Sequence, residues 1–461
     1  MIFNRITSPG LAHNSYFIGS QATAAVVDPR RDGEIYLELA AREELRIRYI
    51  FETHRNEDYV VGSIELAERT GAEIFHGPGL DWGYGTRLHE GAVFQIGRLE
   101  LSALHTPGHT DESMSYVLTD RSTGTEPIMV FTGDALFVSD AGRTDLYGPD
   151  EARRLAGLLY TSIFEKLLPL GDSVILCPAH GAGSVCGSNI SERNESTLGI
   201  ERKQNPVLQV RTKEEFVAQK LREHHERPPY FRQMERYNLE GAPRLGRISL
   251  PPPLPPSEFK KELEHGAVVL DARTPAGFGG AHIKGAYNIW LGGIPAFAGW
   301  VFSYDTPLLL VLESRAELET AVRYLIRLGY DQIAGYLKGG IVQWYNAGLP
   351  VEQLALSTVD ELKSRLESDE DLIVLDVRDE NEWREGHIKG ALHIYVGQLP
   401  NRLDEVPRDR PISVFCNIGH RASLAASILL RAGYTNLCCD VLGSMRAWNA
   451  KKFPVTRDER A

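Results

Sequence analysis

Short apolar runs, each closed by a polar or glycine-containing turn, recur through the first half of the chain. They are Ile47–Phe51, Leu101–Leu104, Ile128–Phe131 and Val174–Leu176. Each run is rich in Val, Ile, Leu or Phe and too short for a helix, so we expect four buried strands. Each strand is followed by a residue that can bind a metal or carry a proton. These residues are His54, His109, Asp134 and His180. Core packing explains such a set poorly, so the pattern predicts a polar site at the strand ends.

A second pattern, strand-like runs alternating with helical ones, occurs twice in the other half. The stretch 269–273 matches 374–378, and 282–286 matches 387–391. Helical runs such as Ala316–Leu328 and Ser423–Leu430 lie between the strands, which predicts two small α/β domains with parallel sheets. The proline run at 251–256 predicts a semi-rigid spacer before them, because proline interrupts helices and central strands. We therefore expect domains at 1–250, 251–352 and 353–461.

Composition fits a multidomain enzyme and excludes several partners. At 461 residues the chain exceeds what one core usually supports. Hydrophobic residues, 43% of the total, are spread throughout, without a stretch long enough to cross a bilayer or a leader at the start. We therefore expect a cytoplasmic protein without a membrane partner. The net charge of −12 argues against nucleic acid, and five irregularly spaced cysteines argue against a disulfide framework.

The segment Thr53-His54-Arg55-Asn56-Glu57-Asp58-Tyr59, followed by His109, Asp134 and His180, resembles the signature of the metallo-β-lactamase fold. That signature reads Thr-His-x-His-x-Asp-His, with His, Asp and His further on. The resemblance covers residues 1 to about 250 and implies an αββα sandwich. Two-metal members carry histidines where this chain has Asn56 and Tyr59, so each metal position has lost an imidazole.

The ligands that remain are His54, His109 and Asp134. A face of two histidines and one carboxylate with open positions favours Fe(II), here one ion per chain, that binds both a substrate and O2. Zinc prefers a fuller set. This pattern, together with Asp134–Leu136 and the stretch 142–145, is similar to the persulfide dioxygenases, iron enzymes that oxidise a thiol-bound sulfane sulfur to sulfite. The resemblance implies a small-molecule thiol persulfide and O2 as substrates.

Further residues are assigned to this site by the same resemblance. Asp58, Tyr59 and His180 would orient the ligands or the bound sulfur from outside the coordination sphere, with Tyr59 and His180 acting in catalysis. Arg143 would contact the substrate. Cys186, in the glycine-rich loop after His180, would meet the substrate at the mouth of the site or remain a plain loop thiol. Two alternatives stay open: a zinc-dependent thioester hydrolase of the glyoxalase II type, and a non-enzymatic persulfide carrier.

The repeated Leu-Asp-x-Arg and His-Ile-x-Gly-Ala elements resemble the rhodanese family of sulfurtransferases over nearly all of 255–461. In the second copy, the strand Ile412–Phe415 ends in Cys416, and a helix begins near Arg421. Backbone N–H groups in such a loop and the helix dipole stabilise an anion, which favours a thiolate nucleophile that can carry sulfur as a persulfide. Cys-x4-Arg is the rhodanese loop length, and one more residue would make room for phosphate. Asn417, Ile418, Gly419 and His420 would bind the sulfur, and Arg421 would act in catalysis with Cys416.

The first copy lacks these groups, because Leu312 stands where Cys416 does and Glu317 where Arg421 does. We expect this copy to be inactive and its surface to hold a homo-oligomer together. The whole architecture resembles fused persulfide dioxygenase–sulfurtransferases of bacterial sulfide detoxification. In that scheme Cys416 passes sulfane sulfur to sulfite to give thiosulfate, or supplies persulfide to the iron site in the reverse sense.

Overall fold

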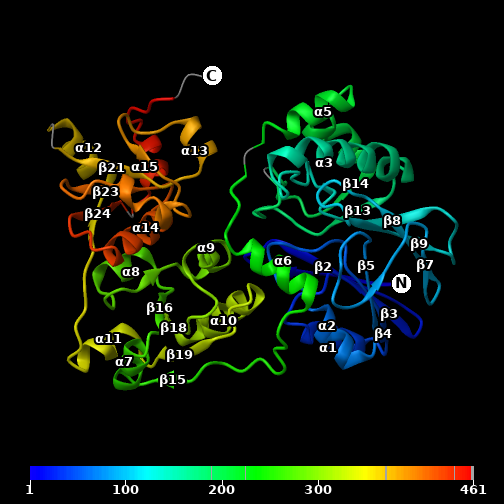
Figure 1. The fold of residues 1–461 in the computed structure, drawn as a ribbon, viewed down its shortest axis with the longest axis horizontal. Helices are drawn as coiled ribbons and strands as arrows, with labels where there is room; N and C mark the ends of the chain where they lie inside the picture. Colours follow the sequence, from blue (N-terminus) through cyan, green and yellow to red (C-terminus); the bar gives the residue numbers. More distant parts are fainter. Residues whose placement is uncertain (188, 224, 369–370, 441, 458–461) are drawn as a thin grey trace. The chain divides into compact units, whose positions relative to one another are not determined.

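The computed structural model describes residues 1–187, 189–223, 225–368, 371–440 and 442–457. It consists of two compact units (Figure 1). One contains residues 1–248 and 326–329, and the other contains residues 249–325 and 330–461. Both predicted repeats therefore fall in the second unit, except for residues 326–329 of the first repeat, and the division into three domains stays a prediction.

Two six-stranded sheets lie face to face in the first unit. The aromatic rings of Phe51 and Tyr116, one from each sheet, pack 4.9 Å apart in the core between them. The first sheet has the order β1 (Ile2–Ser8), β2 (His13–Ser20), β3 (Thr23–Val27), β4 (Arg46–Phe51), β5 (Glu73–His76) and β6 (Thr86–Arg87). The second has the order β14 (Ser196–Thr197), β13 (Ile175–Pro178), β10 (Pro127–Gly133), β9 (Met114–Asp120), β8 (Leu99–His105) and β7 (Val93–Ile96).

Helices cover the outer face of each sheet and complete the αββα sandwich predicted from the sequence. Tyr36 and Leu66 pack on the first sheet, and Leu159 packs on the second. The helices of this unit are α1 (Glu34–Arg42), α2 (Ser63–Thr70), α3 (Pro149–Thr161), α4 (Leu198–Gln204), α5 (Lys213–Lys220) and α6 (Phe231–Glu240). A small ribbon of β11 (Leu136–Phe137) and β12 (Asp140–Ala141) follows the third strand-end residue. All four apolar runs predicted to be strands lie in or overlap β4, β8, β10 and β13.

The second unit contains two five-stranded sheets with the same strand order, and every strand pair in them is parallel. This confirms the repeat. The first sheet has the order β15 (Pro253–Leu254), β19 (Ile333–Leu337), β18 (Leu308–Val311), β16 (Val268–Asp271) and β17 (Tyr287–Asn288). The second has the order β20 (Ala355–Ser357), β24 (Leu437–Asp440), β23 (Ile412–Phe415), β21 (Ile373–Asp376) and β22 (Leu392–His393).

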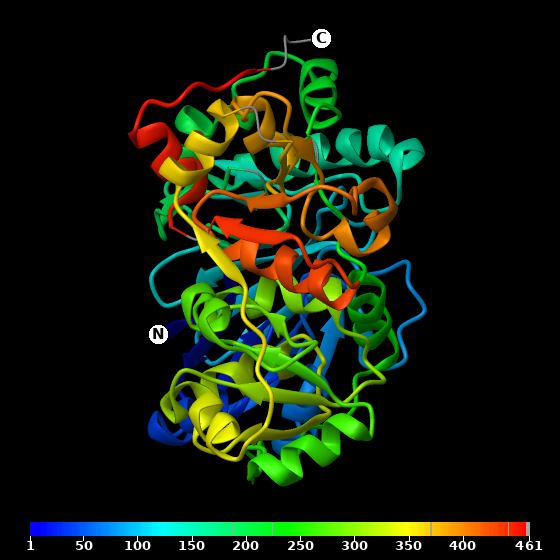
Figure 2. The same cartoon turned by 90° about the vertical axis from the view of Figure 1, so that its left-hand side faces the viewer.

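Helices connect the parallel strands of both repeats. Figure 2 shows α14 in orange-red beside the strands of the second repeat. The first repeat has α7 (Pro256–Glu264), α8 (Pro275–Gly280), α9 (Ile294–Val301), α10 (Leu318–Arg327) and α11 (Gly340–Asn346). The second has α12 (Val359–Glu367), α13 (Glu380–Glu385), α14 (His420–Arg431) and α15 (Ser444–Ala450).

The proline run at 251–256 differs from the spacer that the sequence predicts. Pro253 and Leu254 form β15, which pairs with β19 at the edge of the sheet. An edge position tolerates proline because one side of the strand needs no hydrogen bonds. Pro256 begins helix α7, where a missing N–H costs nothing. The run is therefore part of the first repeat.

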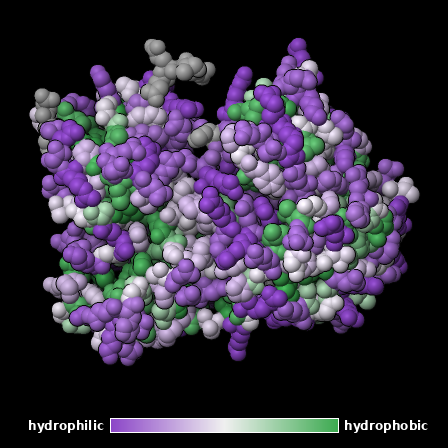
Figure 3. Space-filling view, viewed as in Figure 1, coloured by the Kyte–Doolittle hydropathy of each residue, from purple (hydrophilic) through white to green (hydrophobic). Residues whose placement is uncertain are grey.

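Hydrophilic side chains predominate on the face of the molecule seen in Figure 3, with hydrophobic ones interspersed in small groups. Within the described part of the chain, the helices are too short or too polar to span a bilayer.

Candidate functional site

The four strand-end residues of the first unit converge in a buried cluster. His54 follows β4 in one sheet, whereas Asp134 and His180 follow the paired parallel strands β10 and β13 in the other. The Nε2 atoms of His54 and His109 lie 3.8 and 3.5 Å from Asp134 Oδ2. Gly133, with φ of +54°, allows this approach, since a Cβ there would lie 2.7 Å from the Thr53 side chain. Each of the four side chains is at most 1% exposed.

Hydrogen bonds orient both ligand histidines for a metal. The Thr53 hydroxyl donates to Asp28 at 2.8 Å, so it accepts the 3.0 Å bond from His54 Nδ1–H. The Nδ1–H of His109 donates to the carbonyl of Arg143 at 2.9 Å. Each ring therefore uses its Nδ1–H within the protein and leaves Nε2 as the atom that can bind a metal. Neither Nε2 has a hydrogen-bond partner among the described residues. Together with Asp134, this donor set fits a metal ion.

His180 links two carboxylates instead of facing the two ligand histidines. Its Nδ1 lies 2.8 Å from Asp134 Oδ1, and its Nε2 lies 3.0 Å from Asp58 Oδ2. Burial alone would lower the pKa of His180, but Asp134 and Asp58 outweigh burial and hold it well above its usual range. An imidazole held between two carboxylates fixes the orientation of Asp134, and the catalytic role expected of His180 stays a prediction.

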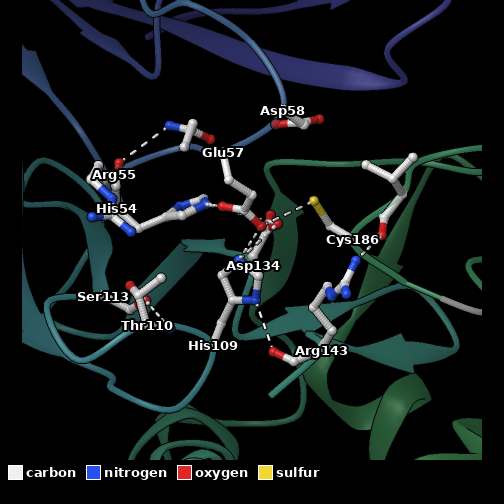
Figure 4. Close-up of polar contacts among 12 residues, drawn as sticks. His54, Arg55, Glu57, Asp58, His109, Thr110, Ser113, Asp134, Arg143 and Cys186 are labelled. Atoms are coloured by element: carbon white, nitrogen blue, oxygen red, sulfur yellow. Dashed lines mark hydrogen bonds and ion pairs between the residues drawn. The ribbon is translucent and has the colours of Figure 1, made fainter. Parts of the chain in front are cut away.

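A carboxylate missed by the sequence analysis lies at the centre of the cluster. Figure 4 shows Glu57 directed between His54, His109 and Asp134. Its oxygens lie 3.1 Å from His109 Nε2 and 3.8 Å from His54 Nε2. The motif leaves position 57 free, so the sequence carried no specific signal for it. Two of the groups that could hold a metal contain this residue: His54 with Glu57 and His109, and Glu57 with Asp134 and Cys186.

Cys186 is buried in this cluster and not on an open loop. Its thiol is 0% exposed and lies 3.6 Å from Glu57 Oε1. Burial, first, and then the neighbouring carboxylates raise its pKa well above the usual value, so the thiol form is favoured. It also belongs to a third group that could hold a metal, with Asp58 and His180.

Arg143, which is expected to contact the substrate, is held by acceptors of the protein in this structure. The guanidinium forms a bidentate pair with Asp145 at 2.7 and 2.8 Å. Its remaining N–H groups donate to the carbonyls of residues 185, 225 and 226. All five donors are therefore used within the protein. Arg143 supports the site, because it ties down the segment before Cys186 and its own carbonyl orients His109.

Tyr59 lies beside the cluster with a second missed residue, His13. The two rings are 3.9 Å apart, and Tyr59 is 6.2 Å from His180. Neither the Tyr59 hydroxyl nor His13 Nε2 has a hydrogen-bond partner among the described residues. His13 reaches the site because Asn14 donates its backbone N–H to the carbonyl of Ala179. Sequence reasoning had no means of pairing these distant segments.

In the second unit, Cys416 directly follows β23 and α14 begins four residues later. Gly419, with φ of +100°, donates its backbone N–H to the Cys416 sulfur at 3.0 Å. Arg421 forms a bidentate pair with Glu382 at 2.6 and 2.7 Å. The His420 ring stacks on Trp290 of the first repeat at 4.5 Å, while Asn417 and Ile418 are exposed. The cysteine itself is only 1% exposed.

The corresponding position in the first repeat has no nucleophile. Leu312 directly follows β18, as Cys416 follows β23, and is 7% exposed. Glu317 forms a capping box with Ser314 at the start of the next helical segment. A leucine and a capping glutamate supply neither a thiolate nor a cation at this position.

Comparisons with known proteins agree with this architecture. The metallo-beta-lactamase superfamily model matches residues 8–180, and the rhodanese-like domain model matches 255–347 and 358–451. Persulfide dioxygenase ETHE1 of Homo sapiens is 30% identical over 215 residues, 44% of this chain and 74% of that protein. Hydroxyacylglutathione hydrolase GloC of Haemophilus influenzae is 26% identical over 210 residues, 41% of this chain and 88% of that protein.

A solved metallo-beta-lactamase structure from Staphylococcus aureus subsp. aureus COL has 29% identity and a TM-score of 0.65, covering 73% of this chain and 98% of that one. The chain therefore belongs to the metallo-beta-lactamase superfamily and is related to the persulfide dioxygenases. It also contains tandem rhodanese-like domains, and it is an enzyme.

Proposed function

We propose that this chain is a persulfide dioxygenase joined to a sulfurtransferase. The observation that carries the proposal is the buried face of His54, His109 and Asp134, in which both imidazoles donate through Nδ1 and turn their Nε2 atoms toward Asp134. A face of this kind favours one Fe(II) with open positions. The relationship to persulfide dioxygenases supports the choice of substrate.

Bound Fe(II) supplies the redox chemistry with O2 that no side chain provides. His54, His109 and Asp134 hold the ion, and His180 keeps Asp134 in place through the 2.8 Å contact. Overall, one persulfide, one O2 and one water give the free thiol, sulfite and two protons. The sulfane sulfur loses four electrons, which reduce O2, and the water contributes the third oxygen of sulfite.

Cys416 performs the second reaction without oxygen. Its thiolate attacks the terminal sulfur of a small-thiol persulfide, the S–S bond breaks and the thiol leaves. Sulfite then attacks the outer sulfur of the Cys416 persulfide and releases thiosulfate together with the thiolate. The Gly419 N–H, 3.0 Å from the sulfur, stabilises the anion in both steps. The first repeat takes no part in this chemistry and is proposed to support a homo-oligomer.

Metal analysis of anaerobically purified protein tests the proposal. We expect about one iron per chain, and His109→Ala should lose both the iron and the oxygen uptake with a small-thiol persulfide. Two zinc ions per chain with hydrolysis of S-lactoyl-glutathione would instead support the thioester hydrolase. Iron-free protein that transfers sulfur through Cys416 but consumes no oxygen would support the persulfide carrier.

A further inference from the structure

The carboxylate of Glu57 faces the same two nitrogens as Asp134. One oxygen is 3.1 Å from His109 Nε2 and the other is 3.8 Å from His54 Nε2, compared with 3.5 and 3.8 Å for Asp134 Oδ2. Glu57 is 1% exposed, and its Oε2 has no hydrogen-bond partner among the described residues. A buried carboxylate oxygen is costly unless it is hydrogen-bonded or paired with a cation.

The conformation of the preceding residue explains how Glu57 reaches this position. Asn56 occupies the place of a motif histidine, but its side-chain amide donates to the backbone carbonyl of His54 at 3.2 Å. Its own carbonyl accepts a 2.7 Å hydrogen bond from Asn238. These contacts hold Asn56 against the backbone, and the next side chain along the chain fills the space at the ligand histidines.

We infer that Glu57 is a fourth protein ligand of the metal and takes the place of the imidazole lost at position 56. The ligand atoms of His54, Glu57 and His109 lie within 4.8 Å of one another, as do those of Glu57, Asp134 and Cys186. The inference rests on the proposed function for the identity of the metal, but its geometry requires only that a cation binds.

Charge and coordination number support this role. Two neutral imidazoles and two carboxylates around a divalent ion form a neutral centre, which lowers the cost of burying the two negative charges. Four protein ligands would leave a six-coordinate ion two open positions, which would suffice for one sulfur atom and one O2.

The alternative is that Glu57 only forms an ion pair with a protonated His109. The two interpretations differ in what the loss of the carboxylate does to metal binding. We would titrate the full chain and its Glu57→Gln variant with Fe(II) alone, anaerobically and against a competing chelator, and record the absorption bands of the Co(II)-loaded proteins. Loss of groups outside the coordination sphere commonly costs about 10–100-fold in metal affinity, so loss of a ligand should cost about 100-fold or more.

Glu112→Gln is the matched control. Glu112 is also a fully buried carboxylate, but it accepts hydrogen bonds from the Arg55 backbone and the Tyr147 hydroxyl. We expect this variant to bind Fe(II) as the wild type does, with an unchanged Co(II) spectrum. Glu57→Asp keeps the charge on a shorter side chain and should lie between the wild type and Glu57→Gln. It also provides the test if Glu57→Gln fails to fold by circular dichroism.

An affinity within about threefold of the wild type for a folded Glu57→Gln or Glu57→Asp chain, with an unchanged Co(II) spectrum, would overturn the inference. Its failure differs from failure of the proposed function. If the wild type binds the metal through Glu57 but does not oxidise persulfide, only the proposed function is refuted. If the wild type oxidises persulfide and Glu57→Gln binds the metal unchanged, only the role of Glu57 as a ligand is refuted.

Discussion

The ion pair between Glu382 and Arg421 distinguishes the second repeat from the first, and its removal should impair sulfur transfer selectively. The pair is bidentate, and its side chains are 24% and 16% exposed. The first repeat has a glycine, Gly277, at the position of Glu382. Both repeats share another buried Asp–Arg pair, which therefore belongs to the fold: Asp271 with Arg273, and Asp376 with Arg378.

Glu382→Gln keeps the shape of the side chain and removes its charge. Hydrogen bonds to charged groups contribute about 1.5–3 kcal/mol to stability, and partial exposure reduces this contribution. We therefore expect the free energy of unfolding of the second unit to fall by about 1–2 kcal/mol. Arg421 would also lose its fixed position beside Cys416. Because a displacement of about 1 Å can cost about 100-fold in rate, we expect kcat/KM for thiosulfate formation to fall about 10–100-fold.

The protonation of the Glu382–Arg421 pair determines the pH at which the assay should be run. Burial would raise the pKa of Glu382, but the Arg421 guanidinium outweighs burial and lowers it to about 2. A carboxyl whose pKa is depressed in the folded state stabilises the fold above its unfolded pKa, and this contribution is lost as the pH falls toward 2. At pH 7 the pair contributes fully to stability, so the wild type and Glu382→Gln should be compared at that pH.

The assay is thiosulfate formation from a small-thiol persulfide and sulfite, with oxygen uptake measured in parallel. Glu380→Gln is the control, since Glu380 lies on the same helix and pairs at 3.0 Å with Arg384, which is 61% exposed. We expect it to behave as the wild type, and Glu382→Gln to keep normal oxygen uptake. Wild-type sulfur transfer by Glu382→Gln would refute the positioning role of the pair.

Three further changes address the other parts of the molecule. Cys416→Ser should abolish thiosulfate formation while sulfite formation and oxygen uptake persist. Leu312→Ala should change the amount of neither product. If Cys416→Ser forms as much thiosulfate as the wild type, the Cys416 loop does not transfer sulfur. Tyr59→Phe should retain its iron but turn over about 10–100-fold more slowly, and loss of iron would make the phenol a ligand. Removing the metal with a chelator should lower the melting temperature measured by calorimetry. A ligand at 100 times its Kd stabilises the folded protein by about 2.7 kcal/mol, so an unchanged melting transition would contradict a buried metal.

The sequence predicted the features that depend on local pattern. His54, His109, Asp134 and His180 were found because each follows an apolar run, and the structure brings all four together. Likewise, repeated motifs predicted two parallel sheets, which share one strand order. Glu57 escaped notice because the motif leaves its position free.

What escaped prediction depends on contacts between segments far apart in the chain. His13 reaches the site through the bond between Asn14 and Ala179. The donors of Arg143, which is predicted to contact the substrate, reach acceptors as far along the chain as residue 226. The proline run joins a sheet edge because Tyr336 and Leu337 pair with it there. No local pattern encodes these pairings.

The central claim is that one iron in the first unit oxidises persulfide with O2. The most direct measurement uses the Cys416→Ser chain loaded anaerobically with one Fe(II), because sulfite then accumulates without conversion to thiosulfate. We predict one O2 consumed for each sulfite formed from a small-thiol persulfide, and neither in the metal-free chain. Sulfite formed without oxygen consumption, or thioester hydrolysis with no oxygen uptake, would contradict the claim.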